Sequence, residues 1–139
     1  MTRPTMPYEF GDVVLVRFPF SNLTAFKQRP AVVVSNLRYN TARPDVIIMA
    51  ITSQLRPLRG LGEAWIGEWQ AANLLKPSAI KPVFATVEQN LLLKQLGIQH
   101  PVDQAPLRQA IGSVGLVRRI GNNPALPGVY SSSEQLRHS

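Results

Sequence analysis

Residues 12–52 contain three short apolar segments: DVVLVRF from Asp12 to Phe18, AVVVS from Ala31 to Ser35 and DVIIMAIT from Asp45 to Thr52. Runs of this length that are rich in Val and Ile and bounded by turn residues are typical of β-strands. The segments are apolar at consecutive positions, so both faces of each strand are expected to be covered. The pattern therefore predicts a small, strongly bent sheet with a filled interior.

Two further strands are predicted downstream, EAWIGEW from Glu63 to Trp69 and AIKPVFATV from Ala79 to Val87. Pro82 interrupts the second of these, and because proline has no N–H to donate, it is expected at a sheet edge or a bulge. EQNLLLKQL, Glu88 to Leu96, contains good helix formers and is followed by Gly97, which predicts a helix that ends there.

The stretch from Asp103 to Val114 predicts a last helix. Asp103 is the expected N-cap, and apolar residues follow at helical spacing at positions 107, 110, 111 and 114. Several strands followed by helices indicate a mainly β fold, a small antiparallel barrel with helices packed on its outside.

The length of 139 residues is that of one domain. We predict a barrel domain over residues 1–117 and an irregular tail over 118–139, where Asn, Pro, Gly and Ser cluster without an apolar period. No apolar run approaches the ~18 residues of a spanning helix, and no apolar segment follows Met1 to Pro4 closely enough for a secretory signal. We therefore expect a soluble, cytoplasmic protein with no membrane partner.

The charge balance indicates a polyanionic partner. The chain has 15 Lys and Arg against 8 Asp and Glu, a net charge of +7, and a sequence pI of about 10.6. Of the basic residues 11 are Arg, whose planar guanidinium binds phosphate through two hydrogen bonds and stacks on bases. Nucleic acid is therefore the favoured partner. Codon usage in a GC-rich genome would also explain the excess of Arg over Lys, but not the net charge.

Many familiar combinations of catalytic residues are missing from the sequence. The absence of Cys excludes disulfides and thiol nucleophiles. There are only two His, no GxxxxGK[ST] phosphate loop, and no carboxylate pair with the local spacing of a metal site. We therefore expect no cofactor and no metal.

An arginine and a hydroxyl remain near predicted strand ends. Arg29 precedes Pro30 and the second strand, and Thr52 closes the third in the segment ITSQ. If these strands are antiparallel neighbours, the start of one lies beside the end of the other, and Arg29 and Thr52 share one rim. A fixed cation with a hydroxyl suits cleavage of RNA by its own 2′-hydroxyl, because charge then builds on the phosphate oxygens.

Over about residues 8–115 the chain resembles the PemK/MazF family of toxin endoribonucleases from bacterial toxin–antitoxin systems. The resemblance is carried by ordered segments: GDVV at 11–14, PF at 19–20, SNL at 21–23, KQRPAVVVS at 27–35, IMAITSQ at 48–54 and NLLKPS at 73–78. It implies an SH3-like, partly open antiparallel β-barrel with peripheral helices and a C-terminal helix.

The resemblance also implies a function. It implies an mRNA interferase that cuts single-stranded RNA sequence-selectively without metal and arrests growth. Such a toxin works as a homodimer and is neutralised by an acidic cognate antitoxin. Arg29 and Thr52 occupy the positions of the family's catalytic pair. We expect Arg29 to bind the phosphate and stabilise charge, and Thr52 to donate to, or orient, a reacting oxygen.

Seven further residues are candidates for RNA binding or positioning: Ser53, Gln54, Lys27, Phe26, Arg56, Arg59 and Lys81. Phe26 either stacks on a base or packs its loop onto the barrel. Arg56 and Arg59 either contact the RNA backbone or are solvated loop charges. Trp65 and Trp69 are candidates for the core, a dimer contact or base stacking.

Two other functions remain open. One is a non-catalytic barrel of the same family that binds RNA or a protein, which would bind RNA in a salt-sensitive way without cleaving it. The other is a gyrase-directed poison on a similar barrel, which would arrest DNA supercoiling and leave RNA whole.

Overall fold

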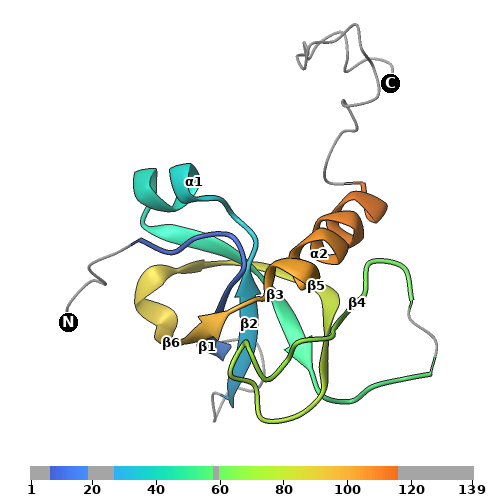
Figure 1. Ribbon diagram of the computed structural model, residues 1–139. Coiled ribbons are helices and arrows are strands. Elements are labelled where there is room, and N and C mark those ends of the chain that lie inside the picture. The colour runs from blue at the N-terminus through green and yellow to red at the C-terminus, as the bar shows by residue number, and fades with distance from the viewer. Residues whose placement is uncertain (1–6, 19–26, 58–59, 116–139) are drawn as a thin grey trace, which may run out of the picture.

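The computed structural model describes residues 7–18, 27–57 and 60–115. Its strands form one six-stranded antiparallel sheet in the order β4-β5-β3-β2-β1-β6, curled into a half-barrel with two α-helices (Figure 1). The elements in chain order are β1 Asp12–Phe18, β2 Lys27–Val33, α1 Leu37–Ala42, β3 Asp45–Thr52, β4 Ala64–Ile66, β5 Ser78–Glu88, the 3-10 helix η1 Gln89–Leu91, β6 Leu92–Ile98 and α2 Pro101–Ser113.

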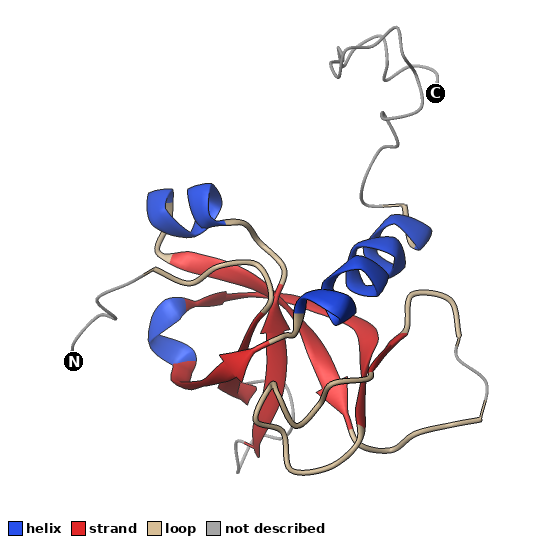
Figure 2. Ribbon diagram, viewed as in Figure 1, coloured by secondary structure: helices blue, strands red, loops and turns tan. Residues whose placement is uncertain are grey.

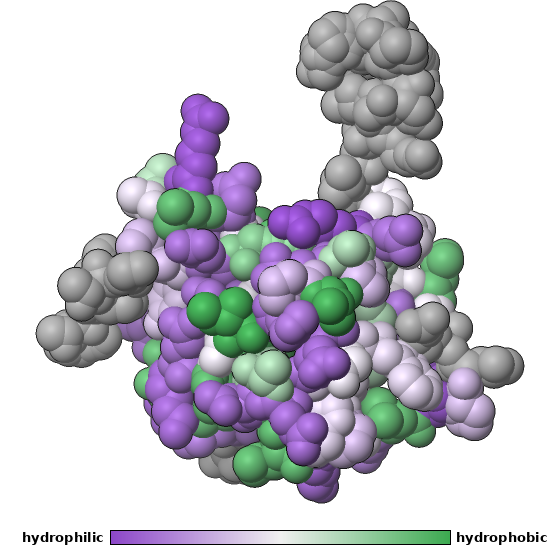
Figure 3. Space-filling view, in the orientation of Figure 1, coloured by the Kyte–Doolittle hydropathy of each residue, from purple (hydrophilic) through white to green (hydrophobic). Residues whose placement is uncertain are grey.

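Each face of the sheet buries its own apolar cluster, as the two-sided apolar strands predict. Val14 and Val16 of β1 belong to one cluster, whereas Val13 belongs to the other. Leu107 and Ala110 of α2 pack into the second cluster, so α2 covers that face of the sheet (Figure 2). On the side seen in Figure 3, exposed hydrophobic residues form small separate patches among hydrophilic ones.

The predicted strands at 12–18 and 45–52 are confirmed with their boundaries. β2 begins and ends earlier than predicted, β4 is shortened to three residues, and β5 is slightly longer. The pairing of β3 with β5 is irregular between Met49 and Ile51, which pair with Phe84 and Ile80. Pro82 lies within this irregularity, so the prediction of a bulge at the proline is confirmed.

The predicted helix from Glu88 to Leu96 is wrong. The chain makes the short turn η1 and then runs as β6 beside β1, with Val14 opposite Gln95 and Leu15 opposite Lys94. Pairing along the edge of β1 satisfies its backbone groups, and this tertiary gain outweighs the local helix preference of the segment.

Two helix starts also differ from the prediction. Helix α1 was not predicted, and its N-cap is Asn36, whose side chain accepts from the Tyr39 N–H at 2.9 Å. Helix α2 begins two residues before Asp103, and its N-cap is His100, whose Nδ1 accepts from the Val102 N–H at 3.1 Å. Asp103 is therefore not the cap.

The predicted apolar face of α2 is confirmed at Leu107 and Ala110, which are buried, and Ile111 packs partly against them. Within the described ranges, no helix is long and apolar enough to cross a membrane. The predicted tail over 118–139 lies outside the described residues.

Candidate nucleic-acid interface

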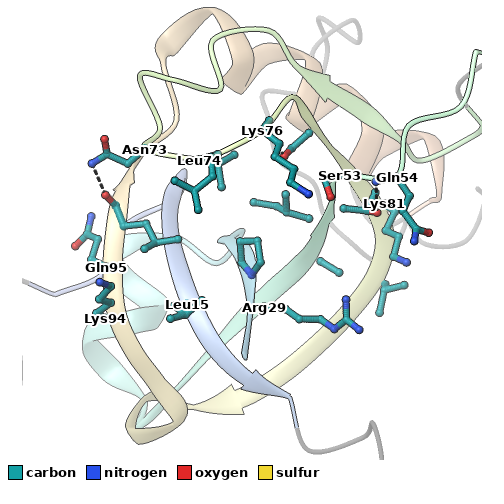
Figure 4. A pocket seen from close by; sticks show the side chains of 18 residues that line it. Leu15, Arg29, Ser53, Gln54, Asn73, Leu74, Lys76, Lys81, Lys94 and Gln95 are labelled. Carbon is teal, nitrogen blue, oxygen red and sulfur yellow. Dashed lines mark hydrogen bonds between the residues drawn. The ribbon is translucent and has the colours of Figure 1, made fainter. Parts of the chain in front are cut away.

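A groove of about 1020 Å³ is lined by residues of β1, β2, β3, β5 and β6 and by the segment 73–76 (Figure 4). Four of its lining residues are basic: Arg29, Lys76, Lys81 and Lys94. None of the described residues that line it is a carboxylate or a histidine. A concave surface lined by one sign of charge concentrates the field and attracts a polyanion.

Strand register places Arg29 and Thr52 together in this groove. β2 and β3 are antiparallel, with Ala31 opposite Ala50. Continuing that register by two residues sets Arg29 opposite Thr52, and both residues line the groove. Arg29 is exposed and forms no salt bridge with the described residues. Its guanidinium is therefore available to an incoming anion.

A local turn holds the Thr52 hydroxyl. Thr52 Oγ1 accepts a hydrogen bond from the backbone N–H of Gln54 at 3.0 Å, which bends the chain directly after β3. A hydroxyl that accepts one bond still has its own hydrogen to donate. Ser53 and Gln54 are exposed beyond the bend and also line the groove (Figure 4).

Of the remaining predicted residues, one lines the groove, one lines a neighbouring cavity, and others lie outside the described residues. Lys81 lines the groove from β5. Arg56 lines a smaller adjoining cavity instead and is paired with Glu63. Phe26 and Arg59 lie outside the described residues, and of Lys27 only the backbone, opposite Phe18 at the start of β2, is described.

Two basic residues of the groove were not predicted as site residues. Lys76 extends toward the middle of the groove from the NLLKPS segment, and Lys94 lies on β6 at the other side (Figure 4). The Lys76 segment is fixed at both ends: Asn73 Nδ2 donates to the Leu96 carbonyl at 2.6 Å, and Ser78 Oγ donates to the Lys76 carbonyl at 2.8 Å. Recognition of residues 92–98 as a strand beside β1 would have placed Lys94 in the groove.

A carboxylate lies close by, in the adjoining cavity. The backbone N–H of Gly60 donates to Glu63 at 2.8 Å, and together with Arg56 it holds the pKa of Glu63 below its usual range. Within the described residues, no group of three or more His, Cys, Asp or Glu is placed to hold a metal ion.

Comparison with protein-family models matches residues 9–114 to the family described as PemK-like, MazF-like toxin of type II toxin–antitoxin system. A search of curated proteins found no match. Among solved structures, a mycobacterial endoribonuclease in complex with its cognate antitoxin superposes with a TM-score of 0.65 at 18% identity, covering 81% of this chain and 99% of that chain.

Two further solved structures have the same fold. The Mycobacterium tuberculosis toxin MazF-mt6 gives a TM-score of 0.63 at 18% identity and covers 78% of this chain and 99% of its own. MazF from Deinococcus radiodurans gives a TM-score of 0.60 at 20% identity, and the match covers 78% of this chain and 96% of that chain. At these identities the likeness establishes the fold.

Proposed function

We propose that this chain, which belongs to the family of PemK-like, MazF-like toxins of type II toxin–antitoxin systems, is an endoribonuclease that cuts single-stranded RNA sequence-selectively without a metal ion. The observation that carries the proposal is the groove, whose described lining residues include four basic side chains and no carboxylate, and to which Arg29 and Thr52 both belong. A polyanion with an internal nucleophile fits such a site, because the protein then mainly positions the strand and stabilises charge.

In the proposed reaction the RNA 2′-oxygen attacks the adjacent phosphorus and loses its proton to water. The bond from phosphorus to the 5′-oxygen of the next nucleotide breaks, and that oxygen takes up a proton. The products are a 2′,3′-cyclic phosphate and a 5′-hydroxyl end. Arg29 binds the non-bridging oxygens and stabilises their growing charge, since a guanidinium stays protonated throughout.

Thr52 donates its O–H to a reacting or non-bridging oxygen, and the N–H of Gln54 keeps the hydroxyl oxygen in place. Ser53, Gln54 and Lys81 position the nucleotides next to the scissile bond. Lys76, which extends toward the middle of the groove, and Lys94, on β6, contact flanking phosphates.

We also propose a cytoplasmic homodimer controlled by an acidic antitoxin that covers the basic groove. The mycobacterial endoribonuclease structure contains a cognate antitoxin, and a Deinococcus radiodurans structure contains MazE with MazF, which supports a partner of this kind.

The test is incubation of the purified protein with a long single-stranded RNA in EDTA. We expect cleavage with 2′,3′-cyclic phosphate ends, and no cleavage at a site whose nucleotide is 2′-deoxy. Arg29→Ala should lower the rate by about 10²-fold or more, because a donor to developing charge is lost. The matched control is Arg38→Ala, which removes an exposed arginine from α1, outside the groove.

Intact RNA with the wild type, or equal cutting by Arg29→Ala, would refute the proposal. Salt-sensitive binding without products would favour the non-catalytic alternative, and inhibition of supercoiling with intact RNA would favour the gyrase-directed one.

A further inference from the structure

A second cavity, of about 270 Å³, adjoins the groove on the side of Thr52. Thr52, Gln54 and Lys81 line both cavities, so they form the boundary between them. We call the second cavity the side pocket; its other lining residues are Leu55, Arg56, Glu63, Trp65, Ala79 and Ile80.

Sheet register links the side pocket directly to Thr52. Thr52 of β3 is opposite Ala79 of β5, and Ala79 is in turn opposite Trp65 of β4. Residues directly opposite on antiparallel strands point to the same face, so these three form one row across the sheet. Two strand spacings, about 10 Å, separate the backbones of Trp65 and Thr52, and Ala79 is the residue between them in the row.

Trp65 presents its indole to this pocket. Its neighbours Ala64 and Ile66 are each 2% exposed, whereas Trp65 is 42% exposed, as the alternation of a strand requires. Exposed aromatic rings are the platforms on which proteins stack the bases of single-stranded nucleic acid.

The charges of the side pocket are compatible with RNA. Arg56 is paired with the Glu63 carboxylate, which also accepts the Gly60 N–H at 2.8 Å. Lys81 adds a further positive charge close to Glu63. Glu63, the only carboxylate among the described residues that line this pocket, is thus compensated, and it does not repel a neighbouring phosphate.

We propose that the side pocket binds one unpaired nucleobase, that of a nucleotide next to the scissile phosphate, stacked on Trp65 with its edge near the Gln54 amide. This rests on the proposed function, since the position of the scissile phosphate is taken from Arg29 and Thr52. With the strand's phosphate at Thr52, one neighbouring nucleotide continues along the groove and the other enters the side pocket.

A binding experiment tests the pocket without cleavage. Trp69→Phe leaves Trp65 as the only tryptophan, since the chain has two. This variant is titrated with single-stranded 2′-O-methyl oligonucleotides carrying a fluorescent label, and both label anisotropy and Trp65 fluorescence are followed. We expect Trp65 fluorescence to be quenched as the oligonucleotide binds. Binding without quenching would overturn the side-pocket proposal, and quenching by an antitoxin or a second protein copy with none by RNA would assign the pocket to protein instead.

A cleavage experiment tests the same subsite by position. Trp65→Leu should lower kcat/KM for the intact substrate by roughly 5- to 100-fold, mainly through KM, and Trp65→Phe should restore most of it. A substrate that is abasic at one position beside the cut should be cleaved equally by wild type and Trp65→Leu. Leu37→Ala on α1 is the matched control, because Leu37 is 44% exposed and outside both cavities.

The two experiments separate the two proposals. Binding and quenching without cleavage would refute the proposed function and keep the nucleobase pocket. If RNA is cleaved, but the losses from Trp65→Leu and from the missing base are additive at every abasic position, the nucleobase pocket is refuted and the proposed function stands.

Discussion

Thr52 contributes one hydroxyl, which accepts a hydrogen bond from the Gln54 N–H at 3.0 Å and keeps its own hydrogen free to donate. Its function should therefore depend on the hydrogen that it donates. We predict that Thr52→Val, which keeps the shape and removes the hydroxyl, lowers the RNA cleavage rate by about 10²-fold or more. Thr52→Ser keeps the donor and should retain most activity. If both variants have the same thermal stability and lose the same cleavage activity, the packing of the Thr52 side chain matters and its hydrogen-bond donation does not.

The charged form of the Asp12 carboxylate destabilises the folded state. It is 6% exposed, and burial raises its pKa, although the Glu9 N–H donates to its Oδ2 at 2.9 Å and partly opposes the shift. With a raised pKa in the folded state, the folded protein holds more protons than the unfolded chain, so stability falls as the pH rises above about 4.

Asp12→Asn lacks this titration and keeps an oxygen to accept the Glu9 N–H. We predict that its free energy of unfolding increases, relative to that of the wild type, as the pH is raised from 3 to 7. Denaturant unfolding at both pH values measures the change. The same difference at the two pH values would contradict a raised Asp12 pKa.

Only part of the candidate site could be predicted from sequence. The shared position of Arg29 and Thr52 was predictable because, in two adjacent antiparallel strands, the start of one lies beside the end of the other. Lys94 required the pairing of β6 with β1, from segments almost eighty residues apart, and local sequence carries no signal for such a contact. The orientation of Trp65 likewise depended on β4 pairing with β5.

At the scale of elements, strands defined by apolar runs were predicted well, and elements fixed by tertiary contacts were not. The segment before Gly97 has helix-forming residues but becomes β6, where Leu92 is buried and Leu93 is 43% exposed. A Cβ at Gly97 would lie 2.7 Å from the Ala72 carbonyl oxygen, so this glycine is required by close packing and does not end a helix.

Asp103 fixes α2 to the turn after β4. The buried carboxylate accepts from the backbone N–H groups of Gly67 at 2.9 Å and Glu68 at 2.8 Å. We predict that Asp103→Ala lowers the free energy of unfolding by about 1–3 kcal/mol, because it leaves two backbone donors without partners. Asp103→Asn, with one acceptor oxygen, should lose less.

Denaturant unfolding measures both variants, and Gln109→Ala, an exposed change on the same helix, is the control. A loss at Asp103→Ala no greater than that of the control would show that these bonds do not anchor α2.

At the scale of the whole molecule, the basic residues that the structure describes are distributed unevenly. All three lysines whose side chains are described, Lys76, Lys81 and Lys94, line the groove, but only one of the six described arginines does. Arg43 and Arg56 are paired with Asp45 and Glu63. Among the described residues, lysines therefore supply most of the positive charge of the groove, although the chain has more Arg than Lys.

The lysines of the groove should set the salt dependence of RNA binding. For single strands, the slope of log K against log salt is about −0.7 for each phosphate neutralised. We predict that Lys76→Gln and Lys94→Gln each weaken binding of a 2′-O-methyl oligonucleotide and make the slope shallower by about 0.7. Because Lys76 and Lys94 line separate parts of the groove, the double variant should lose both contributions.

Arg38→Gln on α1 removes one positive charge outside the groove and is the matched control. It should leave the slope unchanged, since a local phosphate contact and not the overall charge releases the counterion. If Arg38→Gln changes the slope as much as Lys76→Gln does, RNA is attracted by the whole basic molecule. The groove would then not be the binding track. Anisotropy titrations from 50 to 200 mM salt decide between the two.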